Sequence, residues 1–192
     1  MLLALAVDMR TNLGVALAGG ALARPVPALA AAIRATADAA EALGPGRPLR
    51  ATGQSLGGAM AQAGAAALWH ARGDRAAPVA VPFATFAASD AGPLLRRAHG
   101  LPGETAFPAA LGANHVSDRD ALTGPGAPFG PPRLGRNRVE RGMHREGLGP
   151  TLLAYHLARA WANHLAGRAV DDPRPAPRPA RAEDWAAFGL AV

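Results

Sequence analysis

The stretch Thr52-Gly53-Gln54-Ser55-Leu56-Gly57-Gly58 decides the predicted fold, because it fits the pattern G-x-S-x-G. In that pattern, the nucleophile elbow, a serine occupies a sharp, strained turn between a strand and a helix. We expect a Cβ at Gly53 or Gly57 to clash with nearby backbone, and glycine tolerates the strained dihedrals of such a turn at little cost. A glycine-rich structural turn is the alternative, since the chain has 23 glycines.

The sequence around this turn favours the elbow. Residues 47–52 predict a short strand, and the small residues from 58 to 69 predict a helix. Upstream, residues 1–7 predict a buried strand, and residues 27–43 an amphipathic helix. Downstream, residues 78–86 predict another strand. Alternating strands and helices imply a parallel sheet, so the predicted fold class is α/β.

At the elbow the chain resembles a known family. Residues 52–59 are similar to the T-G-H-S-L-G-G-[AG] elbow of the fungal-type (class 3) lipases and their bacterial phospholipase-like relatives, which are α/β-hydrolases. Residues 8–14 resemble the D-W-K-T-N-L-G segment of the bacterial members, and residues 84–88 resemble their T-F-N-A-A segment. The resemblance covers roughly residues 8 to 166, with Gln54 in place of the usual histidine.

The resemblance also implies an N-terminally shortened member of the family. In the family, several strands precede the elbow strand, and one of them ends in an R-G-T-like sequence that supplies an oxyanion donor. No R-G-T precedes Asp8, and only one predicted strand lies there. We expect a hydrolase-like domain over residues 1–167, with a small, mostly parallel sheet, and a Pro/Arg-rich tail over residues 168–192.

A nucleophilic serine needs a base within reach and an acid that orients the base, and α/β-hydrolases supply them in the order Ser, Asp or Glu, His. Asp118 and Asp120 follow a predicted last strand over residues 111–116, where a loop at the strand end would hold the acid. Residues 120–123 resemble the acid segment of the family, so Asp120 is favoured and Asp118 is the alternative.

Six histidines compete for the role of base. His144 lies in a glycine-flanked loop ahead of a helix predicted over residues 151–165, and this placement matches the family histidine ahead of its last helix. His156 and His164 fall inside that predicted helix, so we expect packing or surface roles for them. The remaining three, His70, His99 and His115, precede the acid in the chain. The predicted base is therefore His144.

The resemblance implies a serine hydrolase of carboxylic esters, lipase-like or phospholipase-like. Ser55 would attack the ester, His144 would move the proton, Asp120 would orient His144, and the Leu56 N–H would donate to the oxyanion. The implied partner is a lipid or other ester, with transient contact to a membrane surface. The alternative is an inactive shortened hydrolase-like protein or a binding module, since missing strands would leave an exposed sheet edge.

Composition excludes several other classes. Cysteine is absent, and neither a Walker loop nor a metal-spaced His/Glu cluster occurs, so we expect no cofactor or metal. The net charge of +6 would suit nucleic acid, but arginine dominates the basic residues, aromatics form only 5%, and much of the basicity follows residue 130. We interpret this charge as compositional bias and expect no nucleic-acid partner.

The first residues bear on location. Residues 1–7 are too short to span a bilayer and lack the basic region of a signal peptide. We therefore expect a cytoplasmic protein, or one exported without a cleaved signal peptide.

Overall fold

A computed structural model describes residues 50–70, 81–102, 106–128, 134–143 and 155–174 except 157, together with residues 35, 42, 130 and 145. Three predicted features lie wholly or mostly outside these residues: the strand at 1–7, the helix at 27–43, and the tail beyond residue 174.

The described residues form a four-stranded sheet in the order β1-β2-β3-β4, with every neighbouring pair parallel. The strands are β1 (Ala51–Gln54), β2 (Phe83–Phe86), β3 (Gly112–Ser117) and β4 (Arg136–Glu140). Parallel neighbours need crossover connections. Among the described elements, one α-helix lies between β1 and β2, one between β2 and β3, and one after β4. The chain therefore has a small α/β fold with a parallel sheet, as the alternation of strands and helices predicted.

Strand β4 extends the sheet beyond the predicted last strand. Its first four residues are exposed and three of its five residues are charged, so it lacks the apolar alternation that identifies a half-buried strand. A charged strand at the edge of a sheet is a common protection against pairing with other chains. The prediction that the strand at 111–116 is the last one is therefore wrong.

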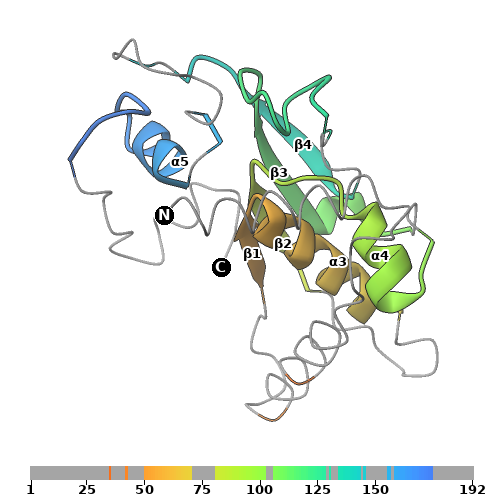
Figure 1. Ribbon diagram of the computed structural model, residues 1–192. Helices are drawn as coiled ribbons and strands as arrows, with labels where there is room; N and C mark the ends of the chain where they lie inside the picture. Colours follow the sequence, from red (N-terminus) through yellow and green to blue (C-terminus); the bar gives the residue numbers. More distant parts are fainter. Residues whose placement is uncertain are drawn as a thin grey trace, which may run out of the picture.

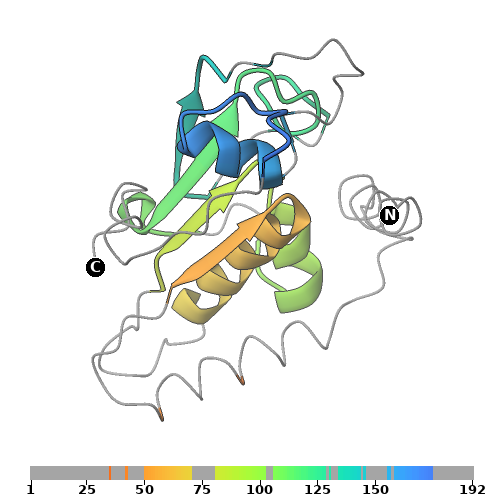
Figure 2. The same cartoon turned by 90° about the vertical axis from the view of Figure 1, so that its left-hand side faces the viewer.

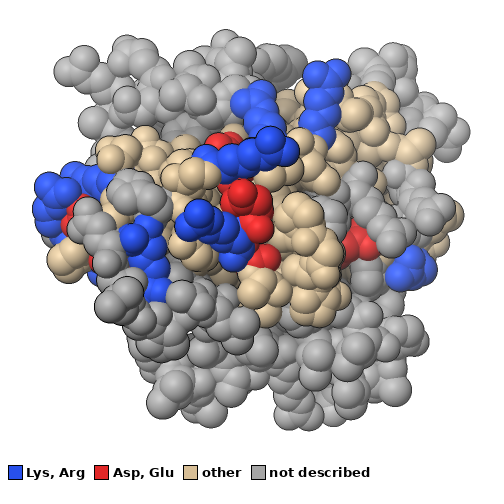
Figure 3. Space-filling view, turned by 90° about the horizontal axis from the view of Figure 1, so that it is seen from above, with Lys and Arg blue, Asp and Glu red and all other residues tan. Residues whose placement is uncertain are grey.

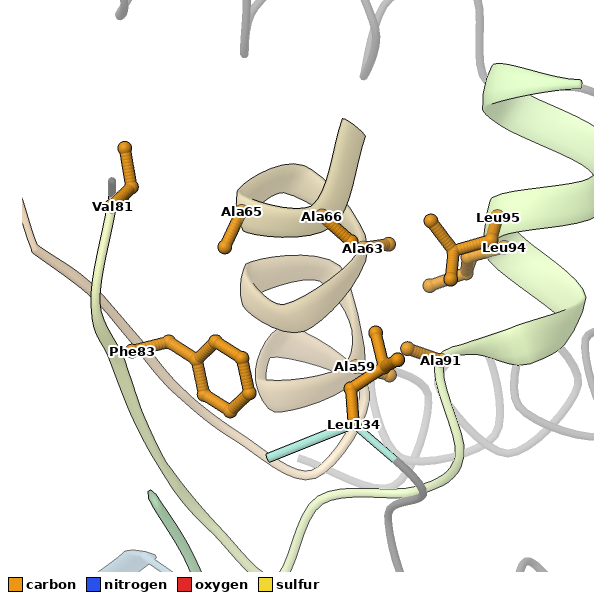
Figure 4. Close-up of a cluster of buried hydrophobic side chains, with 10 residues drawn as sticks. All are labelled: Ala59, Ala63, Ala65, Ala66, Val81, Phe83, Ala91, Leu94, Leu95 and Leu134. Atoms are coloured by element: carbon orange, nitrogen blue, oxygen red, sulfur yellow. The ribbon is translucent and has the colours of Figure 1, made fainter. Parts of the chain in front are cut away.

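Helices α3 (Leu56–His70) and α4 (Gly92–His99) cover one face of the sheet (Figures 1 and 2). Alternation along β2 directs Phe83 to this face, where it belongs to the same buried cluster as Ala59 and Ala63 of α3 and Leu95 of α4 (Figure 4). The alanines of α3 keep the helix close to the sheet, because their side chains add little thickness. This core holds the start of α3, and with it the elbow, in place.

The other face of the sheet is covered by α5 (Ala158–Leu165), as Figure 2 shows. Trp161 of α5 is buried, and its ring centroid lies 5.6 Å from that of Phe86. The Phe86 side chain lies on the face of the sheet opposite to that of Phe83. Val170 belongs to the same cluster, and the Asn163 side chain donates to its carbonyl oxygen at 3.3 Å. The start of the predicted tail thus lies against α5.

None of the helices in the described ranges is long and apolar enough to cross a membrane.

Candidate active site

Ser55 forms the whole turn between β1 and α3. β1 ends at Gln54, α3 begins at Leu56, and Ser55 between them has φ of 55°. A left-handed conformation is uncommon for a residue with a side chain, and its strain of about 1–3 kcal/mol persists only where the surroundings impose it. Here the Ser55 N–H donates to the Phe86 carbonyl at 3.0 Å, and the Ser55 carbonyl accepts from the Gly58 N–H at 3.0 Å. The strand, strained turn and helix that the motif requires are all present.

The glycines around Ser55 differ in what they do. A Cβ on Gly53 would lie 2.3 Å from the Gly57 carbonyl oxygen, which is backbone and cannot easily move. A Cβ on Gly57 would meet nothing within 4 Å, so the predicted clash at Gly57 is wrong. The second close approach is instead at Gly58, whose Cβ would lie 2.5 Å from that of Ala88. Gly53 closes the turn, and Gly58 brings α3 against the end of β2.

Hydrogen bonds between neighbouring strands continue into the loops at their carboxyl ends. In each case the residue directly after a strand donates its N–H to a main-chain carbonyl oxygen at or near the end of the next strand. Ser55 donates to Phe86 at 3.0 Å, Ala87 to His115 at 2.9 Å, and Asp118 to Glu140 at 3.5 Å. This series brings the loop after β3 to the same edge of the sheet as Ser55. It places both predicted acids at that edge.

Of these two acids, the structure brings Asp120 to a histidine. Asp120 is 3% exposed, whereas Asp118 is exposed. The Asp120 carboxylate accepts hydrogen bonds from Thr123 Oγ1 at 2.6 Å, the Leu122 N–H at 2.9 Å and His156 Nδ1 at 2.9 Å. Burial alone would raise the pKa of Asp120, but these donors and the nearby imidazole outweigh it and hold the pKa below its usual range. Asp120 is therefore an ionised acceptor at neutral pH.

The imidazole between Asp120 and Ser55 is that of His156. Its Nε2 lies 2.7 Å from Ser55 Oγ, and its Nδ1 lies 2.9 Å from Asp120 Oδ2. An ionised carboxylate can only accept, so Nδ1 carries the proton of the neutral ring. Nε2 is then the acceptor, and the Ser55 hydroxyl donates to it. This arrangement prepares Nε2 to take the serine proton.

In place of the predicted His144, the structure brings His156 to Ser55 and Asp120. His144 lies outside the described residues, and both hydrogen bonds expected of the base are made by His156. The sequence predicts a helix over 151–165, whereas α5 is Ala158–Leu165 and His156 lies in a turn two residues before it. His156 thus lies ahead of the last described helix, which is the placement that the resemblance predicts for the base. The predicted helix start assigned the base to His144 instead, while His164 does lie within α5.

Two further contacts join the segments that carry the site. The Gln54 side chain donates from Nε2 to the main-chain carbonyl oxygen of His156. Arg119 Nη1 donates to the Tyr155 hydroxyl at 3.4 Å, and the guanidinium lies 5.9 Å from the centre of that ring. The residues directly before the nucleophile, the acid and the base therefore take part in contacts that hold the three segments together.

The N-terminus of α3 lies beside the nucleophile. Leu56 is the first residue of the helix, so its N–H is one of the donors without a partner inside the helix. The helix dipole adds a partial positive charge at the same place. A negative oxygen that forms next to Ser55 would be stabilised there.

The face over the carboxyl ends of the strands has mixed charge. Basic and acidic side chains lie next to one another on its described part, without an uninterrupted basic surface (Figure 3). Within the described residues, no cluster of three or more His, Asp or Glu side chains could hold a metal ion.

Comparisons with known proteins were negative. No protein-family model, no curated protein and no solved structure matches this chain. Its function therefore has to be inferred from the residues of the site.

Proposed function

We propose that this chain is a serine hydrolase of carboxylic esters with an α/β-hydrolase-like fold and a catalytic triad of Ser55, His156 and Asp120. One observation carries the proposal: the two nitrogens of a single buried imidazole lie 2.7 Å from Ser55 Oγ and 2.9 Å from a buried carboxylate. The strained conformation of Ser55 supports it, because backbone strain of this kind concentrates at functional sites.

The reaction would proceed in two halves. Ser55 Oγ attacks the ester carbonyl carbon while its proton passes to His156 Nε2, and the carbonyl oxygen becomes an oxyanion. The tetrahedral intermediate collapses when the C–O bond to the alcohol breaks and Nε2 returns the proton to the departing oxygen. Water then attacks the acyl-enzyme with His156 as base, and the carboxylic acid leaves as Ser55 regains its proton.

The remaining groups stabilise charge during these steps. Asp120 holds the Nδ1 proton of His156 and stabilises the imidazolium that forms, without accepting the proton itself. The Leu56 N–H donates to the oxyanion, a contribution worth about two to three orders of magnitude in turnover for one donor. Lipase-like or phospholipase-like substrates are supported by the resemblance of the elbow to the class 3 lipases. The mutual contacts of the triad weigh against the alternative of an inactive hydrolase-like protein or binding module.

A fluorophosphonate probe tests the proposal, because it reacts with a serine that is activated by its base and needs no knowledge of the substrate. We expect the wild-type protein to be labelled at Ser55 and Ser55→Ala not to be labelled. His156→Ala should lose about four orders of magnitude or more in labelling rate. The matched control is His144→Ala, which should react like the wild type.

Two results would contradict the proposal. Absence of labelling in a folded wild-type protein would rule out an activated serine. Loss of labelling in His144→Ala but not in His156→Ala would show that the wrong histidine was assigned. A labelled protein should then release carboxylate from nitrophenyl esters, and a series of acyl lengths together with phospholipid substrates would identify its preference.

A further inference from the structure

Gln54 is the last residue of β1 and directly precedes the nucleophile. It pairs in register with Phe86 of β2, so the two side chains lie on the same face of the sheet. Phe86 packs against the cluster that contains Tyr155 and Trp161, on the α5 side. Gln54 therefore extends toward the segment that carries His156, and its Nε2 donates to the His156 carbonyl oxygen.

We propose that Gln54 is a positioning residue that holds the main chain of His156 in register with Ser55, an inference that rests on the proposed function. A carbonyl oxygen can only accept, so the amide must present its NH₂ group to His156. The His156 ring is held from the other side by Asp120, which follows β3. The ring of His156 is thus held by Asp120 after β3, and its backbone is held by Gln54 at the end of β1.

This second point of attachment is needed because His156 lies in a turn and not in α5. Catalytic groups on loops are less well fixed than those on helices or strands unless other contacts support them. The distance of 2.7 Å from Nε2 to Ser55 Oγ already lies near the short end of hydrogen-bond reach. A displacement of about 1 Å at the base can cost about 100-fold in rate.

Gln54→Leu removes the donor with little change of size. We expect its labelling rate and kcat to fall about 10- to 100-fold, with little change in KM for a small ester, because the proposed role of Gln54 is to position His156 and not to bind the ester. Gln54→Glu keeps the shape but presents an acceptor to the carbonyl at neutral pH, so it should lose at least as much. Gln54→Glu also tests the positioning role if Gln54→Leu does not fold.

The matched control is Gln62→Leu. Gln62 is fully buried in α3, and neither of its side-chain polar atoms has a hydrogen-bond partner in the described structure. The same substitution there removes an amide without removing a hydrogen bond. We expect its labelling rate to equal that of the wild type.

A second measurement follows His156 without any reaction. The Nδ1 proton that His156 shares with Asp120 should give a far-downfield proton resonance, assigned by its absence in His156→Ala. We expect this resonance to persist in Gln62→Leu and to broaden or disappear in Gln54→Leu, because a mobile His156 exchanges this proton faster.

The two measurements separate the outcomes. Wild-type labelling and an intact resonance in Gln54→Leu or Gln54→Glu would overturn the positioning role and leave the proposed function standing. A different result would support the positioning role and overturn the proposed function: the probe does not label the wild-type protein, yet its resonance is present and is lost in Gln54→Leu. Equal losses in Gln54→Leu and Gln62→Leu would also overturn the positioning role.

Discussion

Two alanine substitutions four residues apart should have opposite effects on the elbow. In Gly53→Ala the new Cβ would lie 2.3 Å from the Gly57 carbonyl oxygen, whereas real Cβ atoms essentially never approach closer than 3.0 Å. The backbone must therefore move by roughly 0.7 Å, the difference between these two distances. Overpacking of this kind costs about 1–3 kcal/mol of unfolding free energy. Because the strain falls on the turn that holds Ser55, the labelling rate should fall by about 10- to 100-fold as well.

Gly57→Ala is the matched control within the same motif. Its Cβ meets nothing within 4 Å, and Gly57 is exposed in the first turn of α3. Alanine is the better helix former, so the free energy of unfolding should stay the same or rise by up to about 1 kcal/mol. Urea unfolding and fluorophosphonate labelling of both variants measure these effects. The reasoning would be refuted by a Gly53→Ala protein with wild-type stability and labelling, or by a Gly57→Ala protein that is destabilised.

Three further predictions follow from the contacts. Asp120→Asn should fold but lose about four orders of magnitude in kcat. The asparagine amide would donate to Nδ1 of His156, so the ring proton would sit on Nε2 and the ring could not accept from Ser55. Near wild-type turnover would contradict the assigned tautomer. Since the pKa of Asp120 is lowered on folding, its carboxylate stabilises the protein above the unfolded-state pKa of about 3.9, and this stabilisation is lost as the pH falls through the folded-state pKa. The unfolding free energies of the wild type and Asp120→Asn, measured in urea, should therefore converge at acid pH, and a constant difference would argue against the lowered pKa. Gln62→Leu should raise the unfolding free energy by about 1–3 kcal/mol, because an unsatisfied buried amide is removed; a lower melting temperature would indicate a partner for Gln62.

Local sequence was sufficient to place the residues that we propose as nucleophile and acid. The elbow is a contiguous motif with its own geometric demands, and Ser55 occupies the strained turn that these demands predict. The acid follows a strand, and parallel strands bring their carboxyl ends to one edge, so Asp120 could be placed near Ser55 from chain order. The α/β class followed from the same alternation.

The base and the last strand depended on information that short stretches do not contain. The sequence predicts one helix over residues 151–165, whereas Tyr155 and His156 form a turn ahead of α5. Tyr155 packs in the same buried cluster as Trp161, a tertiary contact that a short stretch of sequence does not reveal. Because the predicted helix included residue 156, the sequence favoured His144 over the proposed base His156. β4 was missed because its side chains are mainly exposed and charged, so hydrogen bonding to β3 identifies it and apolar periodicity does not.

The proposed triad is assembled from distant parts of the chain. The nucleophile and the base are 101 residues apart in sequence, and the acid and the base are 36 apart. During synthesis the ribosome therefore delivers Ser55 long before His156, the histidine that we propose activates it. A nascent chain would carry an unreactive Ser55 until the segment around α5 has emerged and docked. Under the proposed function, reactivity of this serine would thus report that the segment around α5 has docked, and a nascent chain without that segment would be unable to attack esters.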